Sequence, residues 1–268
     1  VRLGDDLLFF TLPGVPRELD KMMEVMKARF REELDYEHEA RQMLFFAKLH
    51  EGDPRIRMPR LVEEASGKRV LTSEFVSGMT FEEACQAAEA ERAEWAQTLW
   101  RFVFKGNLVG SRFNADPHPG NYIFHPGGVV TFLDFGCVQE IKPDHHARAV
   151  EVHMAALRKD LDAFRASCRA MFHSKPGALE DAAIAYTREC FEPLFGSPYH
   201  ITKDYAASLV VGMKALAKMV RSVPESEFFT MPSNMLFMNR LQFGFYSVLA
   251  RLDVTVDYGE VERGFLTP

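Results

Sequence analysis

The feature that most restricts the fold of this chain is a polar loop, followed by a short hairpin and then by an acidic turn. The loop is Asn114–Asn121, and the turn is Asp134-Phe135-Gly136. Residues 122–124 and 129–132 lie between them and flank His125-Pro126-Gly127-Gly128. Aromatic and β-branched runs on either side of a glycine-containing turn predict two antiparallel strands. The hairpin is therefore expected to carry the loop and the acidic turn at its open end.

The register of this hairpin determines which polar side chains meet. If Phe124 faces Val129, Asn121 lies opposite Phe132. Asp134 is then two residues beyond the partner of Asn121, roughly 7 Å along the strand. An amide oxygen and a carboxylate are thus expected at one edge, and oxygen ligands of this kind hold Mg²⁺ together with substrate phosphates. We predict that Asn121 and Asp134 are metal ligands.

The spacing of these residues is typical of phosphoryl transfer. Protein kinases place a catalytic aspartate, an asparagine five residues later, and then an Asp-Phe-Gly turn whose aspartate holds metal. Asp116 and Asn121 have this spacing, and Asp134 opens the turn. Asp116 is expected to orient the attacking hydroxyl or water and to accept its proton. Either element alone would indicate only a local turn, whereas the two together indicate a catalytic site.

The rest of the chain predicts many helices and few strands. Helices are assigned where apolar residues recur at three- and four-residue spacing, and strands where short β-branched or aromatic runs occur. The expected elements are a helix over 16–50 that ends before Gly52, strands at Arg60–Glu64 and Arg69–Val76, a capping box at Thr80–Glu83, a helix over Arg92–Val109, and helices after Pro143.

Composition excludes several classes of protein. The net charge of −6 and the scattered Lys and Arg residues argue against a nucleic-acid partner. The four cysteines, which have no C-x-x-C spacing, fit free thiols in a reducing compartment. No apolar run reaches the ~18 residues of a spanning helix, and Phe228–Leu252, which comes nearest, is predicted to be a buried helix. We expect a cytoplasmic protein and leave peripheral membrane contact open.

Three motifs in order resemble the UbiB (AarF-like) family of atypical kinases. The first is Glu33–Ala40, which is similar to the E-x-D-(Y/F)-x-x-E-A block of that family. The second is Asn114–Asn121, identical to its N-A-D-P-H-P-G-N loop, and the third is Leu133–Gly136. The resemblance spans nearly the whole chain. It implies a protein-kinase-like fold, ATP and Mg²⁺ as cofactors, and a role in ubiquinone or other prenyl-lipid metabolism with a lipid or quinone precursor as acceptor.

The resemblance also assigns roles to further residues. It implies that Glu39 is the helix carboxylate that pairs with an ATP-binding lysine. Glu33 and Asp35 belong to the same block and are implied to contribute to cofactor binding; in the family, the surface that carries Glu33 meets an extension with a K-x-G-Q motif. Thr72–Gly78 resembles the hinge, so the backbone of Glu74, Phe75 and Val76 is expected to contact adenine.

The expected fold class is α+β and protein-kinase-like. Residues 1–78 would be the remnant of a small lobe with its hinge at 74–78, and residues 79–268 a mostly helical large lobe. The strand with the ATP-binding lysine should precede Val1, so we expect a piece of a longer protein. Nucleotide binding by residues 1–268 alone is therefore expected to be weak.

Alternatives remain open at this point. A small-molecule kinase of the aminoglycoside- or choline-kinase type also has a D-x-H-x-G-N loop, although the block at Glu33–Ala40 argues against it. A nucleotide-sensing pseudokinase scaffold would keep the fold without turnover. Three histidines, His145, His146 and His153, suggest a metal site, but without zinc-ligand spacing a helix start after Pro143 explains them more simply.

Overall fold

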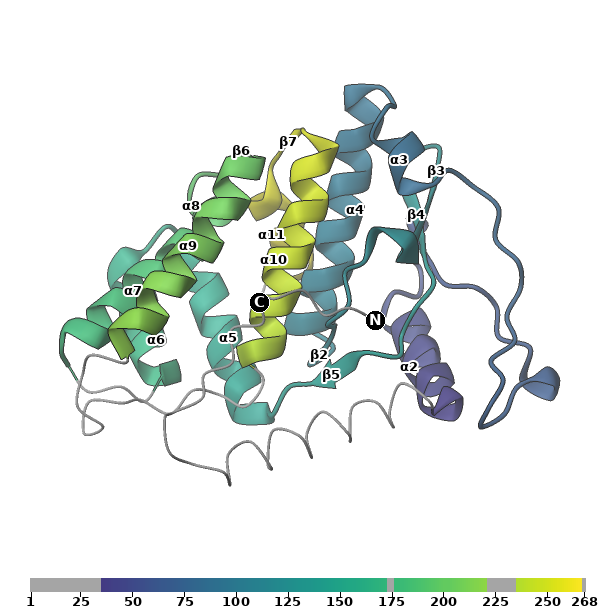
Figure 1. Cartoon of the computed structure of the whole chain (residues 1–268), viewed down its shortest axis with the longest axis horizontal. Helices are drawn as coiled ribbons and strands as arrows, with labels where there is room; N and C mark the ends of the chain where they lie inside the picture. The colour runs from purple at the N-terminus through teal and green to yellow at the C-terminus, as the bar shows by residue number, and fades with distance from the viewer. Residues whose placement is uncertain (1–34, 173–175, 221–234, 267–268) are drawn as a thin grey trace.

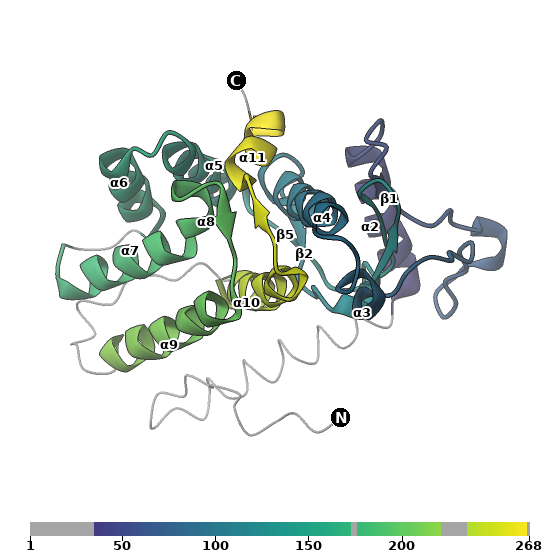
Figure 2. The ribbon, with the colours of Figure 1, turned by 90° about the horizontal axis from the view of Figure 1, so that it is seen from above.

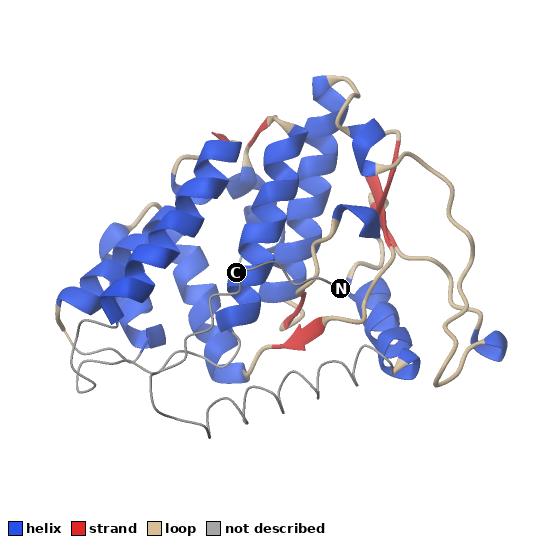
Figure 3. Ribbon diagram, in the orientation of Figure 1, coloured by secondary structure: helices blue, strands red, loops and turns tan. Residues whose placement is uncertain are grey.

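The computed structural model describes residues 35–172, 176–220 and 235–266 (Figure 1). Helices dominate and the strands are short, as Figure 3 shows. The longer helices are α2 (Tyr36–Leu49), α4 (Glu89–Leu108), α5 (Pro143–Leu157), α6 (Leu161–Phe172), α7 (Ala178–Cys190), α9 (Lys203–Val220), α10 (Met235–Leu252) and α11 (Tyr258–Leu266). Glu33 and most of the predicted helix 16–50 lie outside the described residues.

Three small sheets complete the part of the chain that the structure describes. β1 (Ile56–Arg57), β4 (Val129–Phe132) and β3 (Tyr122–His125) form the first sheet, in that order. β2 (Arg112–Asn114) pairs with β5 (Val138–Glu140), and β6 (Tyr199–His200) pairs with β7 (Thr255–Val256). In Figure 2, α4, α10 and α11 lie between the first sheet with α2 on one side and α6, α7 and α9 on the other.

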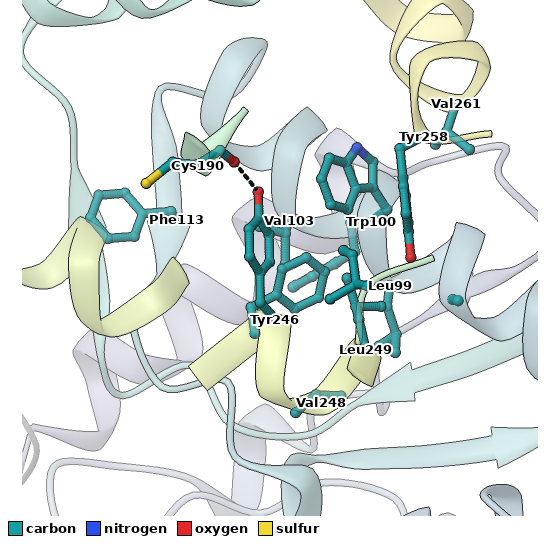
Figure 4. Close-up of a cluster of buried hydrophobic side chains, with 14 of the residues drawn as sticks. Leu99, Trp100, Val103, Phe113, Cys190, Tyr246, Val248, Leu249, Tyr258 and Val261 are labelled. Carbon is teal, nitrogen blue, oxygen red and sulfur yellow. Dashed lines mark hydrogen bonds between the residues drawn. The ribbon is translucent and has the colours of Figure 1, made fainter. Parts of the chain in front are cut away.

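Helix α4 is the centre of the hydrophobic core. Its buried side chains include Leu99, Trp100 and Val103, which pack against Tyr246 of α10 and Tyr258 of α11 (Figure 4). The rings of Trp100 and Tyr258 are 4.2 Å apart between centroids. For the part of the Met/Phe-rich segment that the structure describes, α10 confirms the predicted helix, and most of residues 243–252 are buried or half-buried; residues 228–234 lie outside the described ranges. No helix in the described ranges is long and apolar enough to cross a membrane.

Polar contacts tie the last helix to this core. The Trp100 indole Nε1 donates to Glu262 Oε1 at 3.0 Å, and His153 Nδ1 lies 2.9 Å from Glu262 Oε2. The Glu262 side chain is fully buried. His146 contacts the Leu108 carbonyl through Nε2 at 2.9 Å. Two of the three histidines considered for a metal site therefore have structural partners.

The start of α2 differs from the sequence prediction. Asp35 lies before the helix with non-helical backbone angles, and its Oδ1 accepts a hydrogen bond from the His38 N–H at 3.1 Å. An aspartate at this position satisfies an amide that has no partner in the first turn. The prediction of a continuous helix through Asp35 is therefore wrong, whereas its end before Gly52 is confirmed.

The predicted strands Arg60–Glu64 and Arg69–Val76 are also not formed. The two segments approach each other only through isolated bridges, Leu61 to Ser73 and Gly67 to Val70, and η1 (Glu63–Ala65) interrupts the first. Figure 1 shows this part as a long loop that reaches away from the body. In the described part of the chain no other strand flanks it, so an extended ladder has no second neighbour to stabilise it.

The hairpin after the polar loop forms, but its register is one residue away from the predicted one. Phe124 pairs with Val130 and Tyr122 with Phe132, so Asn121 lies beside Leu133. Gly127 and Gly128 both have a φ of +74°. That left-handed backbone, which glycine adopts readily, closes the turn over three residues instead of four.

Candidate functional site

Strand β2 and the loop after it are held by the side chain of Asn114. The Asn114 Nδ2 donates to the Asp134 carbonyl at 2.6 Å, and its Oδ1 accepts from the Asp116 N–H at 3.0 Å. One side chain thereby fixes the start of the polar loop and the acidic turn. Asn114 received no role of its own in the sequence prediction, although it opens the polar motif and ends a strand.

Asn121 joins the same arrangement from the other end of the loop. Its backbone carbonyl accepts from the Leu133 N–H at 3.0 Å, which places it next to Asp134. Its Nδ2 donates to the Asp116 carbonyl at 3.3 Å. With the amide nitrogen engaged in this way, the Oδ1 of Asn121 is the atom left to serve as a metal ligand. The structure thus brings Asp116, Asn121 and Asp134 together.

The turn at Asp134 also meets the beginning of α2. The Gly136 N–H donates to Asp134 Oδ1 at 2.9 Å, and the Phe135 N–H donates to Glu39 Oε1 at 3.3 Å. Phe135 is fully buried and packs against Phe46 of α2, with ring centroids 5.6 Å apart. A β-carbon on Gly136 would lie 3.5 Å from Asp134 Oδ1 and 3.7 Å from Glu39 Oε2, so both carboxylates border the same glycine.

Burial raises the pKa of Glu39 above its usual value, and the nearby charge of Asp134 adds to the rise. The hydrogen bond from Phe135 acts in the opposite direction. A carboxylate in this position is stabilised by any cation that comes near it.

The donor set fits a magnesium ion held mainly by nucleotide phosphates. Among the described residues no group of three or more His, Cys, Asp or Glu side chains could hold a metal on its own. Asn121 and Asp134 offer hard oxygen atoms at one edge. Mg²⁺ is commonly bound by one or two carboxylates together with phosphates and waters, and such a site needs no third protein carboxylate.

The predicted hinge lies along a pocket of about 530 Å³. Glu74, Phe75 and Val76 form part of its lining, together with the loop after α2 and β1. The lining also includes His125 and Thr131, whose side chains are 2.9 Å apart between Nε2 and Oγ1. Phe75 is 93% exposed, so its ring stays in contact with solvent although the residue lines the pocket.

The end of the hinge is attached directly to the hairpin. Met79 and Phe124 exchange two backbone hydrogen bonds of 2.9 Å. A β-carbon on Gly78 would lie 2.5 Å from Ile123 Cγ2 and 2.9 Å from the Phe124 carbonyl oxygen. Only glycine therefore allows this close approach.

His50 is a polar residue of this pocket that the sequence did not single out. It is 2% exposed, and neither ring nitrogen has a hydrogen-bond partner among the described residues. Its ring stacks near Phe102, with centroids 5.2 Å apart. Burial, reinforced by the charge of Lys105, lowers its pKa to about 3, so the imidazole is neutral at physiological pH.

Not every predicted site residue reaches the centre. Asp116, Asn121, Asp134 and Glu39 come together, whereas the hinge residues line a pocket whose lining includes none of these four. Asp35 instead caps α2. Glu33 lies outside the described residues.

Comparison with known proteins gives a family and several relatives. Residues 6–168 match the sequence model of the ABC1 atypical kinase-like domain. "Protein ACTIVITY OF BC1 COMPLEX KINASE 3, chloroplastic" of Arabidopsis thaliana is 25% identical over 222 residues, 78% of this chain and 31% of the relative. "Atypical kinase COQ8B, mitochondrial" of Danio rerio is 29% identical over 153 residues, 53% of this chain and 24% of the relative.

An uncharacterised protein of Synechocystis, sll0005, is 30% identical over 147 residues, 54% of this chain and 22% of the relative. The chain thus spans less than a third of the length of these relatives. Among solved structures, a complex of Rv3197 with erythromycin from Mycobacterium tuberculosis superposes with a TM-score of 0.68 at 21% identity. That superposition covers 95% of this chain and 63% of the other. Together with the match to the ABC1 atypical kinase-like domain, it confirms the α+β, kinase-like fold class.

Proposed function

Because this chain belongs to the ABC1 atypical kinase-like family, we propose that it carries the phosphoryl-transfer site of an atypical kinase or ATPase that uses Mg-ATP. The observation that carries the proposal is the bridge made by Asn114, which ties the backbone of Asp116 to that of Asp134. Relatives named as kinases support the same class of activity. The link to ubiquinone or another prenyl-lipid pathway comes from the family resemblance.

Each residue of the site has a role in this proposal. Asp116 orients the attacking hydroxyl or water and accepts its proton. Asn121 and Asp134 hold Mg²⁺, which when bound neutralises charge on the transferred phosphoryl group. Glu39 attracts a cation to the phosphate side of the site. The backbone of Glu74, Phe75 and Val76 borders the pocket that would receive the nucleobase.

The test is ATP hydrolysis by the complete protein that contains this chain, measured with and without Mg²⁺. Asp134→Asn keeps the size of the side chain and removes its charge, so we expect the magnesium-dependent rate to fall at least a hundredfold. Asp162→Asn is the matched control, because that carboxylate is 97% exposed and far along the chain in α6.

The same assay decides between turnover and sensing. Magnesium-dependent nucleotide binding without hydrolysis in the wild-type protein would contradict the enzymatic proposal and favour a nucleotide-sensing scaffold.

A further inference from the structure

A second pocket, of about 250 Å³, borders the polar loop. Loop residues 116–119 form one wall, and Gly244, Ser247, Val248 and Arg251 of α10 form the other. These four residues share one face of the helix, since they are spaced three, four and seven residues apart. The pocket belongs neither to the hinge nor to the metal edge, yet Asp116 borders it.

The loop rests directly on α10 at this point. A β-carbon on Gly244 would lie 2.6 Å from Pro117 Cγ, which is closer than non-bonded carbon atoms approach. Pro117 is buried. The position of Asp116 relative to α10 is therefore fixed by contact on one side and by Asn114 on the other.

Among the described residues, Arg251 is the one cation that lines this pocket. Its guanidinium carbon lies 4.5 Å above the Phe81 ring, and its Nη2 donates to Glu82 Oε1 at 2.9 Å. A guanidinium has five N–H donors in a fixed plane, so the contact with Glu82 orients the group without using all of them. The group is thus held in place while it still has donors to offer.

His118 and Ser247 add neutral donors. The His118 Nδ1 accepts a hydrogen bond from the Gly120 N–H at 3.1 Å. In a neutral imidazole the other nitrogen, Nε2, must then carry the proton. The Ser247 hydroxyl is on the exposed side of α10. The pocket therefore combines donors suited to an anion with one carboxylate, Asp116, suited to a hydroxyl.

We propose that this pocket binds the phosphate acceptor, and that the acceptor is a hydroxyl compound with an anionic group a few atoms from the reacting oxygen. Asp116 takes the hydroxyl, and the donors around Arg251 take the anion. The inference rests on the proposed function, which supplies ATP. It adds the acceptor class and the residues that recognise it.

The acceptor hydroxyl gives its proton to Asp116, and its oxygen forms a bond to the γ-phosphorus of ATP. The bond between that phosphorus and the β,γ-bridging oxygen breaks, and ADP leaves with the electron pair. Asp116 then returns the proton to solvent. The products are a phosphate monoester and ADP.

The size of the pocket limits what enters it. About 250 Å³ is below the ~300–1,000 Å³ of a site for a drug-sized ligand. A small free metabolite fits, as does the headgroup of a lipid whose tails remain outside. Both sources share the same chemistry, a hydroxyl near a phosphate.

Two binding measurements without nucleotide test the proposal and separate the sources. In the first, sn-glycerol 3-phosphate is titrated into the isotope-labelled chain and followed by NMR, with glycerol as the probe that lacks the anion. In the second, the chain is sedimented with phosphatidylcholine vesicles with or without phosphatidylglycerol. Saturable shifts at Gly244 and Ser247 indicate a free acceptor, whereas phosphatidylglycerol-dependent sedimentation indicates a lipid headgroup.

Three variants give the readout. Arg251→Gln should weaken the binding about tenfold, the usual effect of removing one charge-assisted hydrogen bond. Glu82→Gln removes the charge of this partner but keeps an oxygen that can accept from Arg251, so the guanidinium stays oriented and binding should be retained. Arg165→Gln, an exposed arginine on α6, is the matched charge control.

No binding in either arm would overturn the proposal, as would equal weakening by Glu82→Gln and Arg251→Gln, which would show that only the ion pair matters. Since no nucleotide is present, these outcomes are independent of whether the protein hydrolyses ATP.

Discussion

Glu39 and Asp134 accept hydrogen bonds from successive amides of one turn: the Phe135 N–H donates to Glu39 Oε1 at 3.3 Å, and the Gly136 N–H donates to Asp134 Oδ1 at 2.9 Å. The first carboxylate comes from α2 and the second follows β4, so the turn joins two elements that are far apart in sequence. Two negative groups around one glycine repel each other unless a cation lies between them. The site is therefore electrostatically prepared for a cation.

Removing the charge of Glu39 should stabilise the chain when no cation is bound. Glu39→Gln keeps an oxygen for the Phe135 amide and removes the repulsion with Asp134. We expect the Tm at pH 7 to rise by about 1–2 °C, measured by differential scanning calorimetry, while ATP hydrolysis by the complete protein falls.

The pH dependence of this gain follows from the raised pKa of Glu39. Below the ordinary glutamate pKa of 4.5 the carboxyl is protonated in both the folded and the unfolded state, so the advantage of glutamine should disappear there. Glu37→Gln, on an exposed position of the same helix turn, should not raise the Tm. A Tm that falls in Glu39→Gln at pH 7 would contradict the prediction.

His50→Phe should also stabilise the chain. The buried imidazole has no hydrogen-bond partner among the described residues, and the site is lined by Phe46 and Phe102. Replacing an unsatisfied polar ring by an apolar ring of similar shape is expected to gain about 1 kcal/mol in the free energy of unfolding at pH 7. Urea denaturation monitored by circular dichroism measures it.

The same variant should flatten the acid side of the stability profile. The folded-state pKa of His50 is about 3, against an ordinary value of 6.5. Its contribution to stability is thus complete above pH 6.5 and is lost as the pH falls toward 3, because only the unfolded chain binds the proton. An unchanged slope between pH 6.5 and pH 4 in His50→Phe would show that this histidine does not titrate as described.

Gly244→Ala should displace the polar loop where Pro117 contacts α10. The new methyl group would lie 2.6 Å from the rigid Pro117 ring, so the loop or the helix must move. Overpacking of this kind costs about 1–3 kcal/mol, which outweighs the ~1 kcal/mol that alanine gains over glycine within a helix. We expect a lower Tm and slower ATP hydrolysis.

Gly264→Ala is the matched control, because nothing lies within 4 Å of a β-carbon at that helical position. It should raise the Tm slightly. A rise of the same size in Gly244→Ala would show that the loop does not rest on α10.

The sequence allowed the site to be predicted better than the surrounding backbone. The polar loop, the hairpin and the acidic turn follow one another closely, so local patterns sufficed to bring Asp116, Asn121 and Asp134 together. The capping box at Thr80 is formed for the same reason. The register was off by one residue because the positive φ angles of Gly127 and Gly128 decide how many residues close the turn.

Features that depend on distant contacts were not predictable. Asp35 was expected within a continuous helix, but it lies before α2 and caps its first turn. The segment around Val70 has a strand-like composition but meets no flanking strand among the described residues, so it forms only bridges. His50 gave no signal at all, since its burial depends on how α2 packs against α4.

We also predict that the complete protein does not phosphorylate proteins in trans. After Gly136 the chain enters β5, which pairs with β2, and α5 begins at Pro143. Protein kinases use a long segment at this place to support a peptide substrate. Incubation with radiolabelled ATP and a peptide library is the measurement, with Asp116→Asn as control. Strong labelling that requires Asp116 would prove this prediction wrong.

The hydrogen bond between Trp100 and Glu262 constrains the order in which the chain can fold during synthesis. The two residues are 162 positions apart. At ~5–20 residues per second, the ribosome needs roughly 10–30 s to add the intervening length. Until then the indole N–H at the centre of α4 has no carboxylate to bind, and closing the core around it would bury an unpaired donor. The nascent chain is therefore expected to close the core around Trp100 only after α11 has emerged.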